Sequence, residues 1–249
     1  NNSLLRGQKP PESNFSSLSG KMSKKIHLGG DECDFLQSLA DRLSRAGAIL
    51  VDSGKDADYV IYIGQGGDGN MIILPPDQKI THSGLVVIIH DLLSPKGKSG
   101  HWGDRELHLW ADMIREGSLD IHTVSNTLPK HWVHVRDVCD ALCTIIMSER
   151  SNSITGNLNI SGRRSWSPES IVKEMTMLWG RYLDSLNYSH TTESLSYIPS
   201  LLSQESNIQV KRPDLSRLHK SLIDCGSEGW HPLVPMRVSL MEIFAHAKE

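Results

Sequence analysis

Short, uninterrupted apolar runs alternate with helical stripes along most of the chain. Strands are expected at 25–28, which runs into Gly29-Gly30, and at 48–51, 59–63, 71–74, 85–89 and 156–160. These runs are continuous rather than alternating between apolar and polar residues, which is typical of strands covered by helices on both faces of a parallel sheet. The pattern therefore predicts an α/β protein with a mostly parallel sheet.

Helices are expected where apolar residues recur every three or four positions. Such stripes run from Phe35 to Leu43, from Leu107 to Ile114, from Val138 to Ile146, from Ile171 to Trp179 and, after Pro235, from Val238 to Phe244. Gly47 suits the left-handed position that ends the first helix. Asp137 is placed to cap the third, and Ser167-Pro168 to open the fourth, which is expected to end before Gly180.

The domain organisation follows from where this order begins and where it weakens. Residues 1–23 are rich in Ser, Asn, Pro and Gly and are expected to form a flexible leader. Residues 24–130 are interpreted as a truncated Rossmann-like domain. Residues 131–249 are interpreted as the C-terminal part, a small α/β substrate-side subdomain with a long Ser-rich loop at 183–207.

Charge and composition argue against two classes of partner. The 249 residues include 26 Lys or Arg and 29 Asp or Glu, a formal net charge of −3, with no basic run longer than Lys24-Lys25. A nucleic-acid partner is therefore not expected. Apolar runs such as 85–89 are far shorter than the roughly 20 residues of a membrane span, so no membrane partner is expected either.

The chain has four cysteines and no CxxC pair: Cys33, Cys139, Cys143 and Cys225. No His or acidic cluster completes a metal site around Cys139 and Cys143, and His131 and His134 lack zinc-site spacing, so no metal is expected. We expect buried or half-buried thiols. Free thiols indicate a reducing compartment and hence a cytoplasmic location.

Four segments, in their order along the chain, carry a family resemblance. They are 58–63 (DYVIYI), 131–138 (HWVHVRDV), 156–161 (GNLNIS) and 229–232 (GWHP). They are similar to the "DVVIHLA", "DFVHVDDVA.AL", "G..YNIG" and "LGW.P" segments of extended short-chain dehydrogenases/reductases, the NAD-dependent nucleotide-sugar epimerases and dehydratases. The resemblance spans about residues 24–247. It implies a Rossmann-like, doubly wound sheet, NAD or NADP as cofactor and a nucleotide-sugar as ligand.

The cofactor fingerprint of that family is incomplete here. Gly29 and Gly30 are present, but the later glycine positions fall at about Cys33 and Leu36, whose side chains would crowd a pyrophosphate. The acidic residues at 31, 32 and 34 would oppose the phosphate charge. Asp52 lies where the family binds the adenine ribose, although a turn-initiating role before Ser53-Gly54 is equally open. Gly29, Gly30 and Asp52 are the candidate cofactor residues, and no cofactor is the favoured expectation.

The family's catalytic Tyr–Lys pair is also missing. Its chemistry uses a Tyr with a Lys four residues later on one helix face. None of the five tyrosines has such a Lys, and only residues 77–84 separate Pro76 from the next strand. The catalytic residues are therefore left unknown.

Two cations correspond to the family's diphosphate-binding arginines. Lys130 stands two residues ahead of Trp132, where the family has an Arg, and Arg212 resembles the Arg of an "RRPGD" segment. Each is either a contact to the substrate diphosphate or a solvated surface cation.

Three interpretations of function follow. The first is a degenerate family member with a binding, regulatory or scaffold role that retains a nucleotide-sugar, with a homodimer or a regulatory protein as partner. In a homodimer, the stripe at 107–114 either supplies a contact helix or faces the core. The second is an enzyme with a rearranged acid–base pair drawn from Asp52, His90, Asp91 or Lys130. The third is that the chain joins stretches of a longer one near Gly66-Gly67 or Pro76-Asp77, in which case the catalytic helix is merely missing.

Overall fold

The computed structural model describes residues 23–64, 67–78, 80–97, 102, 104–120, 124, 127–189, 191–192 and 210–246. The flexible leader expected at 1–23 lies outside the described residues except for Ser23. Of the loop expected at 183–207, residues 190 and 193–207 lie outside them as well.

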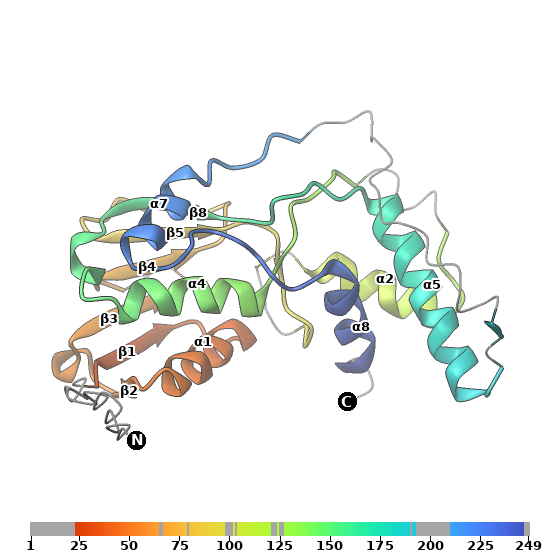
Figure 1. Ribbon diagram of the computed structural model, residues 1–249, viewed down its shortest axis with the longest axis horizontal. Helices are drawn as coiled ribbons and strands as arrows, with labels where there is room; N and C mark the ends of the chain where they lie inside the picture. The colour runs from red at the N-terminus through yellow and green to blue at the C-terminus, as the bar shows by residue number, and fades with distance from the viewer. Residues whose placement is uncertain are drawn as a thin grey trace, which may run out of the picture.

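A six-stranded parallel sheet forms the larger part of the molecule (Figure 1). Its strands are β1 (Lys25–Gly30), β2 (Ile49–Leu50), β3 (Tyr59–Ile63), β4 (Met71–Leu74), β5 (Leu85–Ile89) and β8 (Gly156–Ile160), in the order β2-β1-β3-β4-β5-β8. The chain goes outward from β1 to β2 and returns to the other side of β1 with β3, so the order reverses between β1 and β3. The predicted Rossmann-like α/β class is confirmed.

One face of the sheet is covered by three helices. They are α1 (Asp34–Arg45), α4 (Val135–Met147) and α7 (Ser216–Asp224), and Figure 1 shows α1 and α4 lying side by side in front of the strands. Alternate strand residues such as Ile61, Ile73 and Val87 are fully buried in one cluster with Leu39 and Leu142 of these helices. This cluster is the main core. The sequence analysis did not identify α7.

The opposite face is covered differently from the expectation. The apolar runs predict helices on both faces, but among the described residues this face packs against a connecting loop, where Ile80 lies on Ile72, Leu74 and Val86. Only residues 64–70 join β3 to β4, and only 75–84 join β4 to β5. A parallel crossover with a helix needs a dozen residues or more, so these connections are too short to supply one.

The loop between β3 and β4 runs back close over β3. Asn70 N donates to Val60 O at 2.9 Å, and Asn70 Oδ1 accepts from Val60 N at 2.8 Å. A Cβ at Gly67 would lie 2.0 Å from the Tyr62 ring, so only glycine permits this approach. At Pro76-Asp77 the chain runs through a turn in which Gln78 N donates to Pro75 O at 3.2 Å, while Gly66 lies outside the described residues.

A smaller helical part adjoins the carboxyl ends of the strands (Figure 1). It contains α2 (Arg105–Arg115), α5 (Pro168–Leu186) and α8 (Met236–His246), and a parallel pair of short strands, β6 (Leu92–Leu93) and β7 (Val133–His134), leads into it. Leu107, Trp110 and Ile114 of α2 are buried in a second cluster with α5 and α8, so this stripe faces the core rather than a partner. Short 3₁₀ turns precede β3 (Gly54–Asp56) and β8 (Ser151–Ser153).

Two expectations about α4 and α5 are corrected. Ser167 caps α5 as predicted, with Pro168 at the first position, but the helix continues past Gly180 to Leu186, so the loop expected from 183 begins later. α4 begins one turn earlier than expected and is capped by His134, whose side chain accepts from Arg136 N. Asp137 is therefore inside the helix and buried, not at its cap.

The four cysteines are free, with Cys139 and Cys143 buried and the other two half-buried, which confirms the expected thiols. The helices of the described residues include none that is both long enough and apolar enough to cross a membrane. Within the same residues, no three His, Cys, Asp or Glu side chains group closely enough to hold a metal ion.

Candidate functional site

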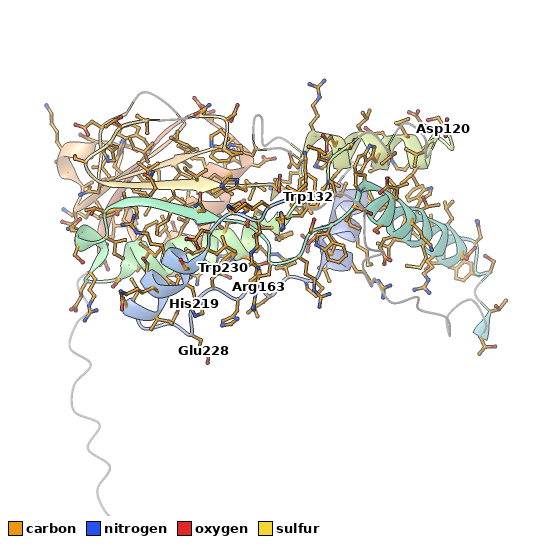
Figure 2. All side chains as sticks on the ribbon, turned by 90° about the horizontal axis from the view of Figure 1, so that it is seen from above. Asp120, Trp132, Arg163, His219, Glu228 and Trp230 are labelled. Atoms are coloured by element: carbon orange, nitrogen blue, oxygen red, sulfur yellow. The ribbon has the colours of Figure 1, made fainter. Side chains whose placement is uncertain are left out.

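A cavity of about 840 Å³ lies between the sheet and the helical part. Its lining comes from five segments that are far apart in the sequence: β6, β7 with the start of α4, the turn after β8, the stretch before α7, and the strap at 231–235 with the start of α8. The lining residues are Leu93, Trp132, Val133, His134, Asp137, Gly162, Arg163, Arg164, Trp166, Arg212, Pro232, Leu233, Val234, Pro235, Met236, Arg237 and Ser239. Figure 2 shows Trp132 and Arg163 at this junction.

The strap at 231–235 is held just before its start and in its middle. Trp230 is buried, and its indole Nε1 donates to Ser161 O at 3.0 Å. The carboxylate of Asp137 accepts from Leu233 N at 2.8 Å and from Val234 N at 3.2 Å. These bonds hold the strap against α4 and so fix one wall of the cavity.

Burial changes the ionisation of two groups in this wall. It raises the pKa of Asp137 above its ordinary value, although the two N–H groups that the carboxylate accepts act in the opposite direction. Burial also lowers the pKa of His134 to about 4, although Glu242 acts in the opposite direction. His134 Nε2 lies 3.2 Å from Glu242 Oε2, so a neutral His134 bridges α4 and α8.

Three arginines give the cavity a positive rim. Arg163 and Arg164 follow β8, and Arg212 precedes α7; all three are exposed and line the cavity. Arg163 Nη1 lies 3.3 Å from His231 Nδ1, and Arg212 Nη1 donates to Arg163 O at 3.3 Å. Neither contact neutralises a guanidinium. The fourth lining arginine, Arg237, is different because it is paired with the buried carboxylate of Glu174.

Lys130, the other residue predicted to contact a diphosphate, does not line the cavity. Its Nζ lies 3.0 Å from Glu106 Oε2 and 5.0 Å from the centre of the Trp132 ring. The main chain of Lys130 exchanges two hydrogen bonds with that of Trp166. Lys130 therefore supports the two tryptophans of the cavity wall, while Arg212 alone of the two predicted residues faces the cavity.

The glycines proposed for a cofactor are required by the sheet itself. Gly30 has φ +109°, and a Cβ there would lie 2.0 Å from Ile63 O. A Cβ at Gly29 would lie 2.7 Å from the Tyr62 ring. Both glycines are therefore needed where β1 meets β3. Asp52 is exposed just after β2.

The turn between β1 and α1 does not fit a dinucleotide pyrophosphate. Asp31 N donates to Ile63 O at 3.0 Å, and the Asp31 carboxylate lies against Gly64, where a Cβ would be 2.4 Å from Oδ2. Glu32 and Asp34 add two further negative charges at the start of α1, where the helix N-terminus favours anions of its own chain. These carboxylates stand where a dinucleotide would place its phosphates.

The residues considered for a rearranged acid–base pair do not all come together. His90 and Asp91 follow β5, whereas Asp52 lies beside the opposite half of the sheet. His90 Nε2 lies 3.1 Å from Asn159 Oδ1, and Asp91 Oδ2 accepts from His131 N at 2.8 Å. Burial lowers the pKa of His131, with Arg212 and His90 acting in the same direction and Asp91 against them.

Sequence reasoning missed Arg163 and Arg164. The signal is a pair of adjacent arginines directly after a predicted strand, which in a parallel sheet places them at the edge where ligands bind. It is weak alone, because nothing in the sequence shows that this turn meets Arg212 and the strap.

The comparisons with solved structures agree on the fold. The chain is similar to RMD of Pseudomonas aeruginosa, solved with NADPH, with 13% identity, a TM-score of 0.54 and coverage of 91% of this chain and 98% of that one. It is similar to the enzyme WbmF of Bordetella bronchiseptica, solved with NAD⁺ and UDP, with 9% identity, a TM-score of 0.55 and coverage of 91% and 92%. UDP-N-acetylglucosamine 4-epimerase of Bacillus cereus gives 9% identity, a TM-score of 0.54 and coverage of 91% and 100%.

The chain matches no protein-family model and none of the curated proteins. The structural neighbours include epimerases and a reductase. The resemblance inferred from the sequence motifs is thus confirmed at the level of the fold.

Proposed function

We propose that this protein binds a nucleotide-linked sugar through its diphosphate and does not perform the dinucleotide-dependent chemistry of its structural neighbours. It is then a binding or regulatory protein of the cytoplasm. The observation that carries the proposal is the rim formed by Arg163, Arg164 and Arg212 around an 840 Å³ cavity with two tryptophans in its wall.

The charge of the cavity suits a diphosphate. Arg237 is paired with Glu174, and the carboxylate of Asp137 is occupied by two main-chain N–H groups. Among the described residues the other three arginines form no salt bridge, although the charge of Arg212 contributes to lowering the pKa of the exposed Asp214. These three guanidiniums can therefore pair with phosphate oxygens. A guanidinium matches phosphate in a two-pronged geometry that an ammonium cannot supply.

The walls of the cavity suit the rest of such a ligand. Trp132 and Trp166 offer aromatic surface for a base or a sugar ring. The UDP complex of WbmF shows that a neighbour of this fold binds a nucleoside diphosphate. That likeness supports the ligand class without identifying the sugar.

The absence of ordinary catalysis rests on two features of this chain. No tyrosine in the sequence is followed by a Lys four residues on. The ten residues between β4 and β5 include the turn at 75–78 and leave no room for a helix that could carry such a pair. The acidic turn after β1 is a further obstacle. The phosphates of a nicotinamide dinucleotide would there face carboxylates instead of an open glycine loop.

Calorimetric titration tests the binding proposal. The protein is titrated with UDP-, GDP- and dTDP-sugars and separately with NAD and NADP, and one class of nucleotide-sugar should bind in the micromolar range. Arg212→Gln should weaken that affinity at least about tenfold, or roughly 1.4 kcal/mol. Arg45→Gln, on α1 and paired with Asp41, is the matched control and should leave it unchanged. Millimolar or absent binding of every nucleotide-sugar would reject the proposal.

A second candidate function is an enzyme that acts on the nucleotide-linked sugar. His90 favours it, because Asn159 holds one ring nitrogen at the carboxyl end of β5, where α/β proteins bind ligands. A histidine at this edge could exchange a proton with a sugar hydroxyl. Loss of turnover in His90→Asn, with unchanged nucleotide-sugar affinity, would establish this alternative.

A further inference from the structure

The turn that carries two of the rim arginines also carries an exposed serine. Its sequence is Arg163-Arg164-Ser165-Trp166, and Arg163, Arg164 and Trp166 all line the cavity. Ser165 is exposed and belongs to no helix or strand. From this juxtaposition we propose that Ser165 is a phosphorylation site for a serine kinase that recognises basic residues, and that its phosphate closes the anion site of the cavity.

The turn meets the needs of such a kinase. Two arginines directly before a serine offer positive charge to an acidic substrate groove. The kinase must also draw the segment into its active site, which an exposed, irregular turn permits and a helix or strand does not. The main-chain bonds of Trp166 to Lys130 and of Gly162 to His131 flank the serine without involving it.

The nearby Ser167 is less accessible to a kinase than Ser165. Ser167 lies three residues after Arg164, but it is half-buried and caps α5. Its hydroxyl accepts from Ser170 N at 3.2 Å and lies 2.9 Å from Ser170 Oγ. Phosphorylation of Ser167 would require this cap to break, so the modification is assigned to Ser165.

The chemistry is a transfer from ATP. The Ser165 hydroxyl oxygen attacks the γ-phosphorus, an Oγ–P bond forms, and the bond from the γ-phosphorus to the bridging oxygen breaks. The hydroxyl proton passes to the kinase's base, and ADP leaves. The product carries a charge of about −2 and three strong acceptor oxygens.

This phosphate would act as a competitor from within the chain. It would lie beside Arg163 and Arg164, and the main-chain carbonyl of Arg163 accepts a hydrogen bond from Arg212 Nη1 at 3.3 Å. Guanidiniums paired with the phosphoserine are no longer available to an external diphosphate. The inference rests on the proposed function only in that the same rim binds the ligand's diphosphate.

The test uses the full chain, the catalytic subunit of cAMP-dependent protein kinase with ATP, and inorganic pyrophosphate as anion probe. Peptide mass spectrometry should place the phosphate on Ser165, and the labelling should be lost in Ser165→Ala. Calorimetry should show pyrophosphate binding to the unmodified protein and to Ser165→Ala, weakened at least about tenfold by phosphorylation. Ser165→Glu should weaken it in the same direction, and Ser44→Glu, on the exposed surface of α1, should not.

Three results would overturn the inference. They are phosphate on other serines while Ser165 stays unmodified, equal pyrophosphate affinity before and after modification, and no pyrophosphate binding to the unmodified protein. The proposed function fails separately. If pyrophosphate binds and is displaced by phosphorylation while no nucleotide-sugar binds, the modification site stands and the nucleotide-sugar proposal falls.

Discussion

The carboxylate of Asp137, in the first turn of α4, accepts the main-chain N–H of Leu233 at 2.8 Å. This bond joins two segments that lie 96 residues apart in the sequence and that both line the cavity. The buried carboxylate thereby holds the strap that forms one wall of the site. It links the stability of the fold to the shape of the cavity.

Removing that carboxylate should destabilise the protein. In Asp137→Ala, the N–H groups of Leu233 and Val234 lose their acceptor, and a buried unpaired polar group costs about 1–3 kcal/mol. Asp137→Asn keeps an acceptor oxygen and should lose less. Chemical denaturation measures both, and equal stability of the alanine variant and the wild type would contradict the role given to this bond.

The same residue predicts a direction of pH dependence. Burial raises the pKa of Asp137 in the folded state above its ordinary value of 3.8, so the folded state binds the proton more tightly than the unfolded chain does. The stability gained from this protonation is complete at pH values below the pKa of Asp137 in the unfolded chain. It is lost as the pH rises through the pKa of Asp137 in the folded state. The free energy of unfolding of the wild type should therefore rise relative to that of Asp137→Asn as the pH falls through that window.

His134 predicts the opposite trend. Its pKa is lowered to about 4 by burial, from an ordinary value of 6.5. Between these two pH values the histidine is protonated in the unfolded chain but not in the folded state. The free energy of unfolding should therefore fall as the pH falls from 6.5 to 4, by an amount on the order of 2 kcal/mol. His134→Asn keeps a capping side chain and should flatten this part of the curve.

An exposed histidine provides the control for that measurement. His231→Asn should leave the slope between pH 6.5 and 4 in place, because this ring is not buried. A slope that persists unchanged in His134→Asn would show that another group causes it.

Substitution of Gly30 tests whether the glycines of β1 are required for the packing of the sheet. Gly30→Ala would place a Cβ 2.0 Å from Ile63 O at a φ of +109°, so it should cost more than about 4 kcal/mol or prevent folding. Gly47→Ala is the matched control, because φ there is +90° but nothing lies within 4 Å of the added Cβ. It should cost about 1–2 kcal/mol. Equal thermal stability of the two variants would contradict the packing role of Gly30.

The sequence was sufficient for the sheet and for most helices, because strand-length apolar runs and helical stripes report burial directly. The strands at 59–63, 71–74, 85–89 and 156–160 have the predicted bounds. The helix α7 was missed because nine residues carry only a short stripe, with Leu218 and Leu222 buried. Helices on both faces were expected because a strand buried by a loop has the same apolar pattern as one buried by a helix.

The site was harder to predict than the fold. Arg212 and Lys130 were both found through family motifs, but the motif could not show that Lys130 would lie against Glu106 of α2 while Arg212 lines the cavity. Asp137 was interpreted as a helix cap, because the neighbouring sequence cannot show that its carboxylate accepts a hydrogen bond from the main-chain N–H of the distant Leu233. Contacts between distant segments set the roles of these residues, and local patterns do not contain them.

The central claim, binding without chemistry on the sugar, is tested most directly by product analysis. The protein is incubated with the nucleotide-sugar that it binds most tightly, with and without NAD and NADP, and the sugar is recovered and resolved by liquid chromatography and mass spectrometry. The account predicts that mass and configuration stay unchanged under every condition. A new epimer, a loss of water or a two-hydrogen change that depends on the protein would contradict it.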